Sequence, residues 1–197
     1  MKRTIQFWYE FASTYSYLSV MRIEQLAQTH NCTIEWKPFL LGPILHAQNM
    51  NDSPFNIYPI KGDYMWKDVA RQAQKLKLEF SKPDIFPKNG LLAARIAVIG
   101  SHQGWCAAFS KAVYLLNFAH NRDISASDEL VNILHTLDLD AEVIMTQANS
   151  DKTKQLLKEQ TNEAAKLGIF GAPSFLVRGE LFWGNDRLED AFSQALE

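Results

Sequence analysis

Hydrophobic residues follow two different spacings along the chain, and these divide it into strands and helices. An aromatic and β-branched run from Thr4 to Phe11 is typical of a buried strand. After a polar turn, apolar residues recur at near-helical spacing to about His30, and residues 32–39 alternate until prolines and a glycine stop the pattern. The first forty residues therefore predict strand, helix and strand, and the right-handed crossover rule makes the two strands parallel.

The middle of the chain, residues 63–167, is mostly helical in pattern. Apolar residues share a helical face in three sets: Met65, Val69, Ala73 and Leu76; Phe109, Val113 and Leu116; and Leu130, Ile133, Leu134 and Leu137. The segment 125–128, Ser-Ala-Ser-Asp, predicts a capping box at the start of the third helix. A later helix over 151–167 should end at Gly168.

Strand patterns return near the C-terminus. Residues 174–177 and 180–183 are rich in strand-forming residues and flank the turn Arg178-Gly179, and a short helix follows over 186–196. The order is β-α-β, a long helical stretch, then β-β-α. This order predicts an α/β fold.

Composition narrows the possible functions. The 197 residues are 47% hydrophobic and 21% charged, as expected of a globular domain, and the formal charge of −2 argues against nucleic acid or an anionic membrane as partner. The only cysteines, Cys32 and Cys106, exclude a disulfide framework, and the histidines show no metal-ligand spacing, so no metal is expected. Without a targeting signal or a long apolar run, the protein is expected to be cytoplasmic.

The first polar turn offers candidate chemistry. Ser13 and Ser16 lie between a predicted strand and the N-terminus of a predicted helix, where α/β proteins bind ligands and where helix amides favour anions. Serine is also a preferred helix N-cap. Capping and catalysis are both open, and one hydroxyl can serve both.

Two later segments are weaker signals when taken alone. Residues 171–174, Gly-Ala-Pro-Ser, precede a predicted strand, and a cis bond at Pro173 would turn the backbone of Ala172 toward an extended peptide. Asn185 or Asp186 can cap the final helix, whose first amides suit a carboxylate.

Together these segments resemble the 2-hydroxychromene-2-carboxylate isomerase family, which belongs with the kappa-class glutathione transferases. The blocks that carry the resemblance run nearly end to end: YEFASTYSYL (9–18), KPFLLG (37–42), FPKN (86–89), FGAPSF (170–175) and GELFWGNDRL (179–188). The resemblance implies a thioredoxin-like domain formed by residues 1–60 and 168–197, with an all-helical domain inserted over residues 61–167.

The resemblance further implies that glutathione is the cofactor. Ser13 matches the family's catalytic serine, whose hydroxyl donates to the glutathione sulfur, and a helix N-terminus there would help to ionise the thiol. The remaining matched glutathione-binding positions are Asn51, Ala172, Pro173, Trp183, Gly184, Asn185 and Asp186. Within this set, the backbone of Ala172 would pair with the cysteinyl unit, and the last four residues would hold the γ-glutamyl end.

The sequence departs from the family at positions that bear on the substrate. Thr14 replaces the usual proline after the serine. Leu45 and Gly90 stand where isomerases of the naphthalene pathway carry a substrate-binding lysine and tyrosine. Loss of both polar anchors predicts weak binding of a carboxylate-bearing aromatic substrate, and Lys61 and Tyr64 are the candidates to compensate.

These observations predict a glutathione-dependent isomerase or transferase that acts on an aromatic enone or a similar small-molecule electrophile, and the resemblance implies a homodimer. The alternative is a non-catalytic thioredoxin-like module that binds a peptide or thiol at Pro173. A disulfide oxidoreductase is disfavoured, because disulfide exchange needs two thiols at the turn and this chain has Ser13 and Ser16 there.

Overall fold

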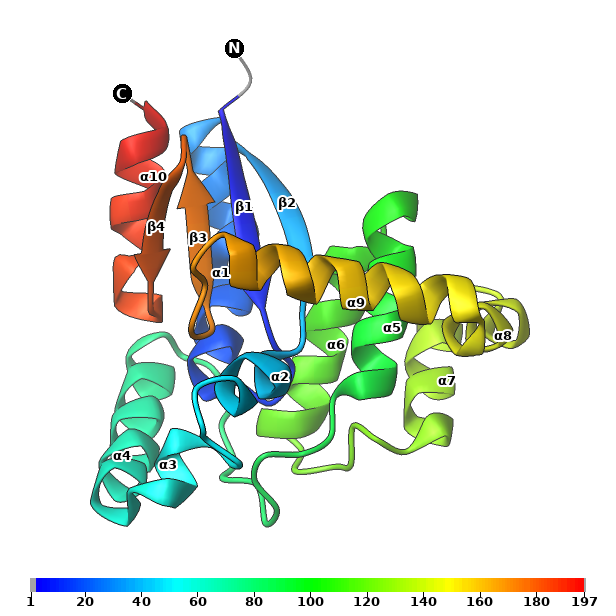
Figure 1. The fold of residues 1–197 in the computed structure, drawn as a ribbon, viewed down its shortest axis with the longest axis horizontal. Coiled ribbons are helices and arrows are strands. Elements are labelled where there is room, and N and C mark those ends of the chain that lie inside the picture. The colour runs from blue at the N-terminus through cyan, green and yellow to red at the C-terminus, as the bar shows by residue number, and fades with distance from the viewer. Residues whose placement is uncertain (1–2, 197) are drawn as a thin grey trace.

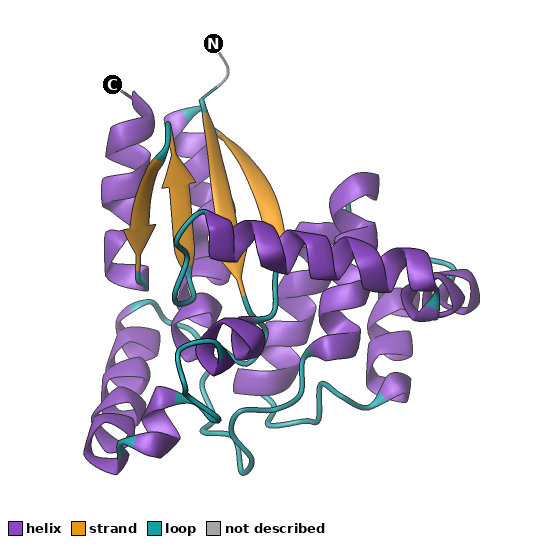
Figure 2. Cartoon of the chain, in the orientation of Figure 1, coloured by secondary structure: helices purple, strands orange, loops and turns teal. Residues whose placement is uncertain are grey.

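Four strands form one mixed sheet in the computed structural model, which describes residues 3–196 (Figures 1 and 2). Their order is β2 (Thr33–Pro38), β1 (Thr4–Tyr9), β3 (Ser174–Val177) and β4 (Glu180–Trp183). β1 and β2 are parallel, as the β-α-β pattern predicted, whereas β3 runs antiparallel to both β1 and β4.

Side chains of β1 alternate between two hydrophobic clusters, one on each face of the sheet. Phe7 belongs to the larger cluster, toward α1 (Thr14–His30) and α10 (Leu188–Leu196). Trp8 belongs to the smaller cluster, which it shares with Ala164 of α9 (Asp151–Lys166). Figure 1 shows α1 behind the sheet and α9 crossing in front of it. The period of two therefore buries both faces of this central strand.

The remaining helices lie mostly beside and below the sheet (Figure 1). They are α2 (Leu41–His46), α3 (Pro54–Ile57), α4 (Pro59–Lys75), α5 (Leu91–Gln103), α6 (Cys106–Phe118), α7 (Ser127–Thr136), α8 (Ala141–Asn149) and the short 3-10 helix η1 (Asn185–Arg187). The larger hydrophobic cluster joins sheet residues to residues of α5, α6 and α7. The boundaries of an inserted domain at residues 61 and 167 stay a prediction.

The structure confirms most of the predicted helices and corrects one cap. The three apolar stripes lie in α4, α6 and α7, and α9 ends before Gly168, which has a left-handed φ of 76°. The predicted capping box at residues 125–128 is wrong: α7 begins at Ser127, and the hydroxyl of Ser125 donates to Asp123 Oδ1 at 2.8 Å. Within residues 3–196, no helix combines the length and the apolar character needed to cross a membrane.

Candidate active site

A cavity of about 900 Å³ lies where the β1–α1 turn meets four other segments of the chain. Its walls come from residues 10–15, the segment 40–55 around α2, the loop 86–91, residues 170–172 before β3, and residues 183–187 after β4, with further residues of α4. Segments distant in sequence thus meet at one end of the sheet. Ser13 and most of the other predicted site residues line this cavity.

Ser13 is the N-cap of α1 and also faces the cavity. Its Oγ accepts a hydrogen bond from the backbone N–H of Ser16 at 3.2 Å and donates one to the carbonyl oxygen of Ala172 at 2.9 Å. Ser16 is fully buried and does not line the cavity. The capping interpretation of Ser13 is therefore confirmed, and the same hydroxyl lies at the positive end of the helix dipole.

Helix α6 holds the turn that carries Ser13. The hydroxyl of Tyr114 donates to the carbonyl oxygen of Glu10 at 2.6 Å, and Asn117 Nδ2 donates to the carbonyl oxygen of Phe11 at 3.1 Å. The backbone N–H of Ser13 donates to the same Glu10 oxygen at 2.9 Å. Residues of the helical segment thus fix the backbone of the β1–α1 turn.

Ala172 and Pro173 connect Ser13 with the segment after β4. The Ala172–Pro173 peptide bond is cis, and Ala172 lines the cavity. Pro173 is buried behind it and is not among the cavity-lining residues; its carbonyl oxygen accepts from the N–H of Gly184 at 2.9 Å. Pro173 therefore shapes the wall from behind rather than presenting its own atoms to the cavity.

The segment after β4 forms an exposed rim of the cavity. Trp183 is half exposed and packs edge-on against Phe170, with ring centroids 4.8 Å apart. Gly184 has a φ of 107°, a conformation that suits glycine. Asp186 is exposed and pairs with Arg187 at 3.3 Å. This rim presents an apolar surface beside one acidic and one basic side chain.

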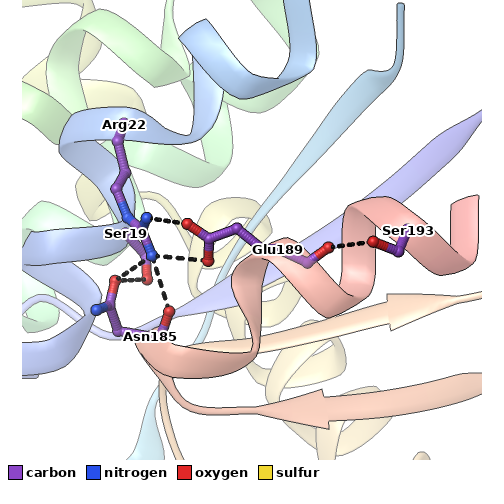
Figure 3. A network of polar contacts seen from close by, with 5 residues as sticks. All are labelled: Ser19, Arg22, Asn185, Glu189 and Ser193. Carbon is purple, nitrogen blue, oxygen red and sulfur yellow. Dashed lines mark hydrogen bonds and ion pairs between the residues drawn. The ribbon is translucent and has the colours of Figure 1, made fainter. Parts of the chain in front are cut away.

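Asn185 is largely committed to holding η1 against α1 (Figure 3). Its Oδ1 accepts from Ser19 Oγ at 3.0 Å and from Arg22 Nη2 at 3.3 Å, and its carbonyl oxygen accepts from the same Arg22 nitrogen at 2.9 Å. Arg22 also pairs with Glu189 of α10. The part of the Asn185 side chain left for a ligand is its Nδ2 amide.

The opposite wall is formed by α2, α4 and the loops beside them. Asn51 lines the cavity and its Oδ1 lies 3.1 Å from His46 Nδ1. Leu45 and Gly90 are both buried in this wall. Because neither has a polar side-chain group, neither can anchor a substrate carboxylate. Lys61 and Tyr64, the two candidates to compensate, are exposed and also line the cavity.

Lys88 lines the cavity, but its ammonium group is already hydrogen-bonded to other parts of the chain. Its Nζ donates to Asn121 Oδ1 at 3.1 Å and to the carbonyl oxygen of Arg122 at 2.8 Å. Burial lowers the pKa of this ammonium, against the raising effect of Asp123 and Asp84. Lys88 therefore ties the loop 86–91 to the end of α6.

The sequence motifs alone did not single out Glu10. Glu10 is one of the residues that line the cavity, and its Oε2 accepts a hydrogen bond from the backbone N–H of Ala12 at 3.0 Å. Burial raises the pKa of Glu10 from an ordinary 4.5 to about 7, and the Ala12 hydrogen bond acts in the opposite direction. The available signal was an acidic residue within an otherwise apolar strand run, directly before the polar turn.

Neither cysteine lines the cavity. Cys106 is buried against the hydroxyl of Tyr9, 3.2 Å away, and burial raises the pKa of its thiol to about 11. Cys32 lies directly before β2, and burial also raises the pKa of its thiol. Both thiols are therefore poor nucleophiles, and a reactive sulfur at Ser13 would have to come from a ligand.

A family model described as a DSBA-like thioredoxin domain matches residues 4–197. The chain belongs to this family. The predicted α/β fold, a thioredoxin-like domain with inserted helices, is confirmed for this DSBA-like chain. The chain differs from a disulfide-exchanging protein in its turn, where it carries Ser13 and Ser16.

Relatives of the DSBA-like chain include members of the isomerase and glutathione transferase families that the sequence motifs resemble. A 2-hydroxychromene-2-carboxylate isomerase of Sphingobium xenophagum is 29% identical over 100% of both chains. The human glutathione S-transferase kappa 1 is 25% identical over 96% of this chain and 89% of its own. A solved 2-hydroxychromene-2-carboxylate isomerase has a TM-score of 0.87 at 25% identity, over 96% of this chain and 93% of the other. The resemblance is thereby confirmed, and these relatives are enzymes.

Proposed function

We propose that the chain is a glutathione-dependent isomerase or transferase for a small electrophile whose reactive carbon is conjugated with a carbonyl. The observation that carries the proposal is the position of Ser13, whose hydroxyl lies at a helix N-terminus and in the wall of a 900 Å³ cavity. Relatives named as an isomerase and as a kappa-class glutathione transferase support the same two reaction types.

The chemistry of the cavity wall fits glutathione. A thiol needs a donor and a positive field, which Ser13 and the first turn of α1 supply. A cysteinyl amide needs a backbone partner, and Ala172 offers one. The γ-glutamyl end carries an ammonium and a carboxylate, for which Asp186 and the Asn185 amide are complementary. Trp183, Gly184 and Asn51 complete the proposed site, with Pro173 behind Ala172.

Ser13 has one proton and therefore one hydrogen bond to give. In the structure this proton is donated to the carbonyl oxygen of Ala172. Donation to a ligand sulfur would break this bond and release the Ala172 carbonyl for an N–H of the same ligand. Ser13 and Ala172 would thus exchange one mutual bond for two bonds to the ligand, while Ser16 continues to orient the serine.

When bound, glutathione supplies a thiolate that adds reversibly to an electrophilic carbon and permits rotation about the former double bond. The chain's part is to orient the electrophile and to keep water from it, which the apolar residues of the cavity do. Leu45, Met65, Phe86 and Leu91 are among the apolar residues that line this cavity, in which the electrophile would lie. The same wall would serve isomerisation, if the product left free of glutathione, or transfer, if it left as a conjugate.

The assembly and location of the chain are also part of the proposal. The family resemblance supports a cytoplasmic homodimer, with a small-molecule electrophile as the main partner. Sedimentation of the purified chain tests the dimer directly, since a monomeric mass at micromolar concentration would contradict it.

The competing function is a non-catalytic binding module. The hydrogen bond from Ser13 to Ala172 favours it, because this bond satisfies the serine without any ligand. A binding module needs the exposed backbone of Ala172 but does not need a hydroxyl at position 13. The two functions therefore differ in what Ser13→Ala does.

An isomerisation assay with glutathione and an uncharged aryl enone separates them. We expect turnover by the natural chain, and Ser13→Ala to lower kcat about 10- to 150-fold, the value of one hydrogen bond to a charged group. Ser193→Ala is the control, since Ser193 is exposed on α10 and bonds only to Glu189 of the same helix. Absence of turnover, or equal loss in both variants, would contradict the proposed function.

A further inference from the structure

Glu10 is the acidic side chain built into the cavity floor beside Ser13. It directly follows β1, which ends at Tyr9, and its Oε2 accepts a hydrogen bond from the backbone N–H of Ala12 at 3.0 Å. Its Oε1 is directed toward the loop 86–91: a methyl group added to Gly90 would lie 3.3 Å from this oxygen. The carboxyl group thus sits between the turn that carries Ser13 and the wall proposed for the electrophile.

No cation is paired with this carboxyl group among residues 3–196. Tyr114, from α6, faces the backbone of Glu10, and burial raises its pKa well above the ordinary value. Lys88, from the loop 86–91, is bonded to Asn121 and Arg122 instead. The other titratable groups of the cavity wall are Tyr15, His46, Asp52, Lys61, Tyr64, Asp186 and Arg187. Burial without a cation, which raises the Glu10 pKa to about 7, leaves both protonation states accessible near neutral pH.

We propose that Glu10 is the catalytic acid and base for the electrophile, donating a proton to its carbonyl oxygen and later recovering it. This inference rests on the proposed function and adds a residue to it. The hydrogen bond from Ala12 fixes Oε2, and Oε1 is the carboxyl oxygen turned toward Gly90 in the electrophile wall.

The proton transfer balances in both directions. As a nucleophile adds to the conjugated carbon, the π electrons move onto the carbonyl oxygen. The O–H bond of Glu10 then breaks, its electron pair stays on the carboxylate, and an O–H bond forms on the substrate to give an enol. On reversal the carboxylate takes this proton back, and the electron pair restores the double bond as the nucleophile leaves. No oxidant or further reactant is required.

The first test needs neither glutathione nor substrate. Carboxyl-detected ¹³C NMR of the full chain should show one glutamate that titrates with a midpoint of about 7, and Glu10→Gln should remove this resonance. Glutamine keeps an oxygen that can accept from the Ala12 N–H, so the turn should persist. A midpoint below 5 for Glu10 in the natural chain would overturn the proposal, whether or not the variant folds.

The second test measures turnover against pH. Above about pH 7 the natural chain should lose kcat as Glu10 ionises, whereas Glu10→Gln should lack this limb and have a kcat at least 100-fold lower, with glutathione affinity changed less than twofold. Glu180→Gln, at an exposed site on β4, should behave as the natural chain. An unchanged kcat and pH profile in Glu10→Gln would overturn the inference while leaving the proposed function intact; failure of glutathione to bind the natural chain would overturn both.

Discussion

The side chain of Ser13 makes two hydrogen bonds that have different consequences. The hydrogen bond accepted from the backbone N–H of Ser16 caps the N-terminus of α1, and it would persist with a ligand present. The one donated to Ala172 must be given up before the hydroxyl can serve a sulfur. A serine that only capped the helix would need the first bond alone. The second bond couples Ser13 to the loop before β3, and thereby joins two parts of the proposed glutathione site.

Glu10 should make stability depend on pH in a specific direction. Its folded pKa of about 7 lies above the ordinary 4.5, so its contribution to stability is fully present below pH 4.5 and is lost as the pH rises to about 7. We expect the free energy of unfolding of the natural chain to fall relative to Glu10→Gln across this window, by up to roughly 3 kcal/mol. Urea unfolding at pH 4.5, 6 and 8 measures the difference. A constant difference would mean that Glu10 titrates normally.

Helix α6 connects the helical segment to the site through single hydrogen bonds. The hydroxyl of Tyr114 and the amide of Asn117 both donate to carbonyl oxygens of the β1–α1 turn. Both donor side chains are buried, and leaving a buried polar group without its hydrogen-bond partner costs free energy. The position of Ser13 is therefore set partly by a helix about a hundred residues later in the chain.

Removal of the Tyr114 hydroxyl should weaken the fold and loosen the turn. For Tyr114→Phe we expect a loss of about 1–2 kcal/mol in the free energy of unfolding, because the ring remains and the hydrogen bond to Glu10 is lost. Thermal and urea unfolding measure it, with Tyr58→Phe as the control because Tyr58 is 59% exposed. Equal stability of Tyr114→Phe and the natural chain would show that α6 does not hold the turn through this bond.

Helices whose buried residues are spaced along one stripe were predictable from the sequence, whereas α5, whose buried residues are consecutive, was not. α4 and α7 each bury one stripe and so show a clear period. α5 buries seven of its thirteen residues, and these form a consecutive run that is broken only at Arg95. Its hydrophobic residues therefore show little helical periodicity in the sequence. α8 was also missed, although Asp140 caps it by accepting from the N–H of Val143. That cap was a usable signal.

The cavity itself exists only in the folded chain, since its walls come from segments as far apart as residues 10 and 187. Motifs predicted which segments would meet, and they did so for Ser13, Ala172 and the rim around Trp183. They could not show that Asn185 Oδ1 is occupied by Ser19 and Arg22, nor that Glu10 faces the cavity. Both facts depend on side-chain orientation, which residue spacing does not determine.

The wall composition predicts the charge preference of the whole enzyme toward its electrophile. Because Leu45 and Gly90 provide no polar anchor, we expect kcat/KM for an aryl enone methyl ester to exceed that for the free carboxylate by about tenfold or more. Matched rate measurements on ester and acid test this. A preference for the acid would contradict the prediction and point to Lys61 as the anchor, which the variant Lys61→Met would test.

The most direct measurement of the central claim is the ionisation of bound glutathione. Calorimetry should first show saturable binding of glutathione to the natural chain at millimolar concentration or below. Ultraviolet absorbance of the bound thiolate, near about 240 nm, should then titrate below the free thiol pKa of about 8.5, and Ser13→Ala should raise the bound pKa by about 1–2 units. No binding, or identical thiolate titrations for the natural chain and Ser13→Ala, would contradict the account of Ser13 as the residue that activates glutathione.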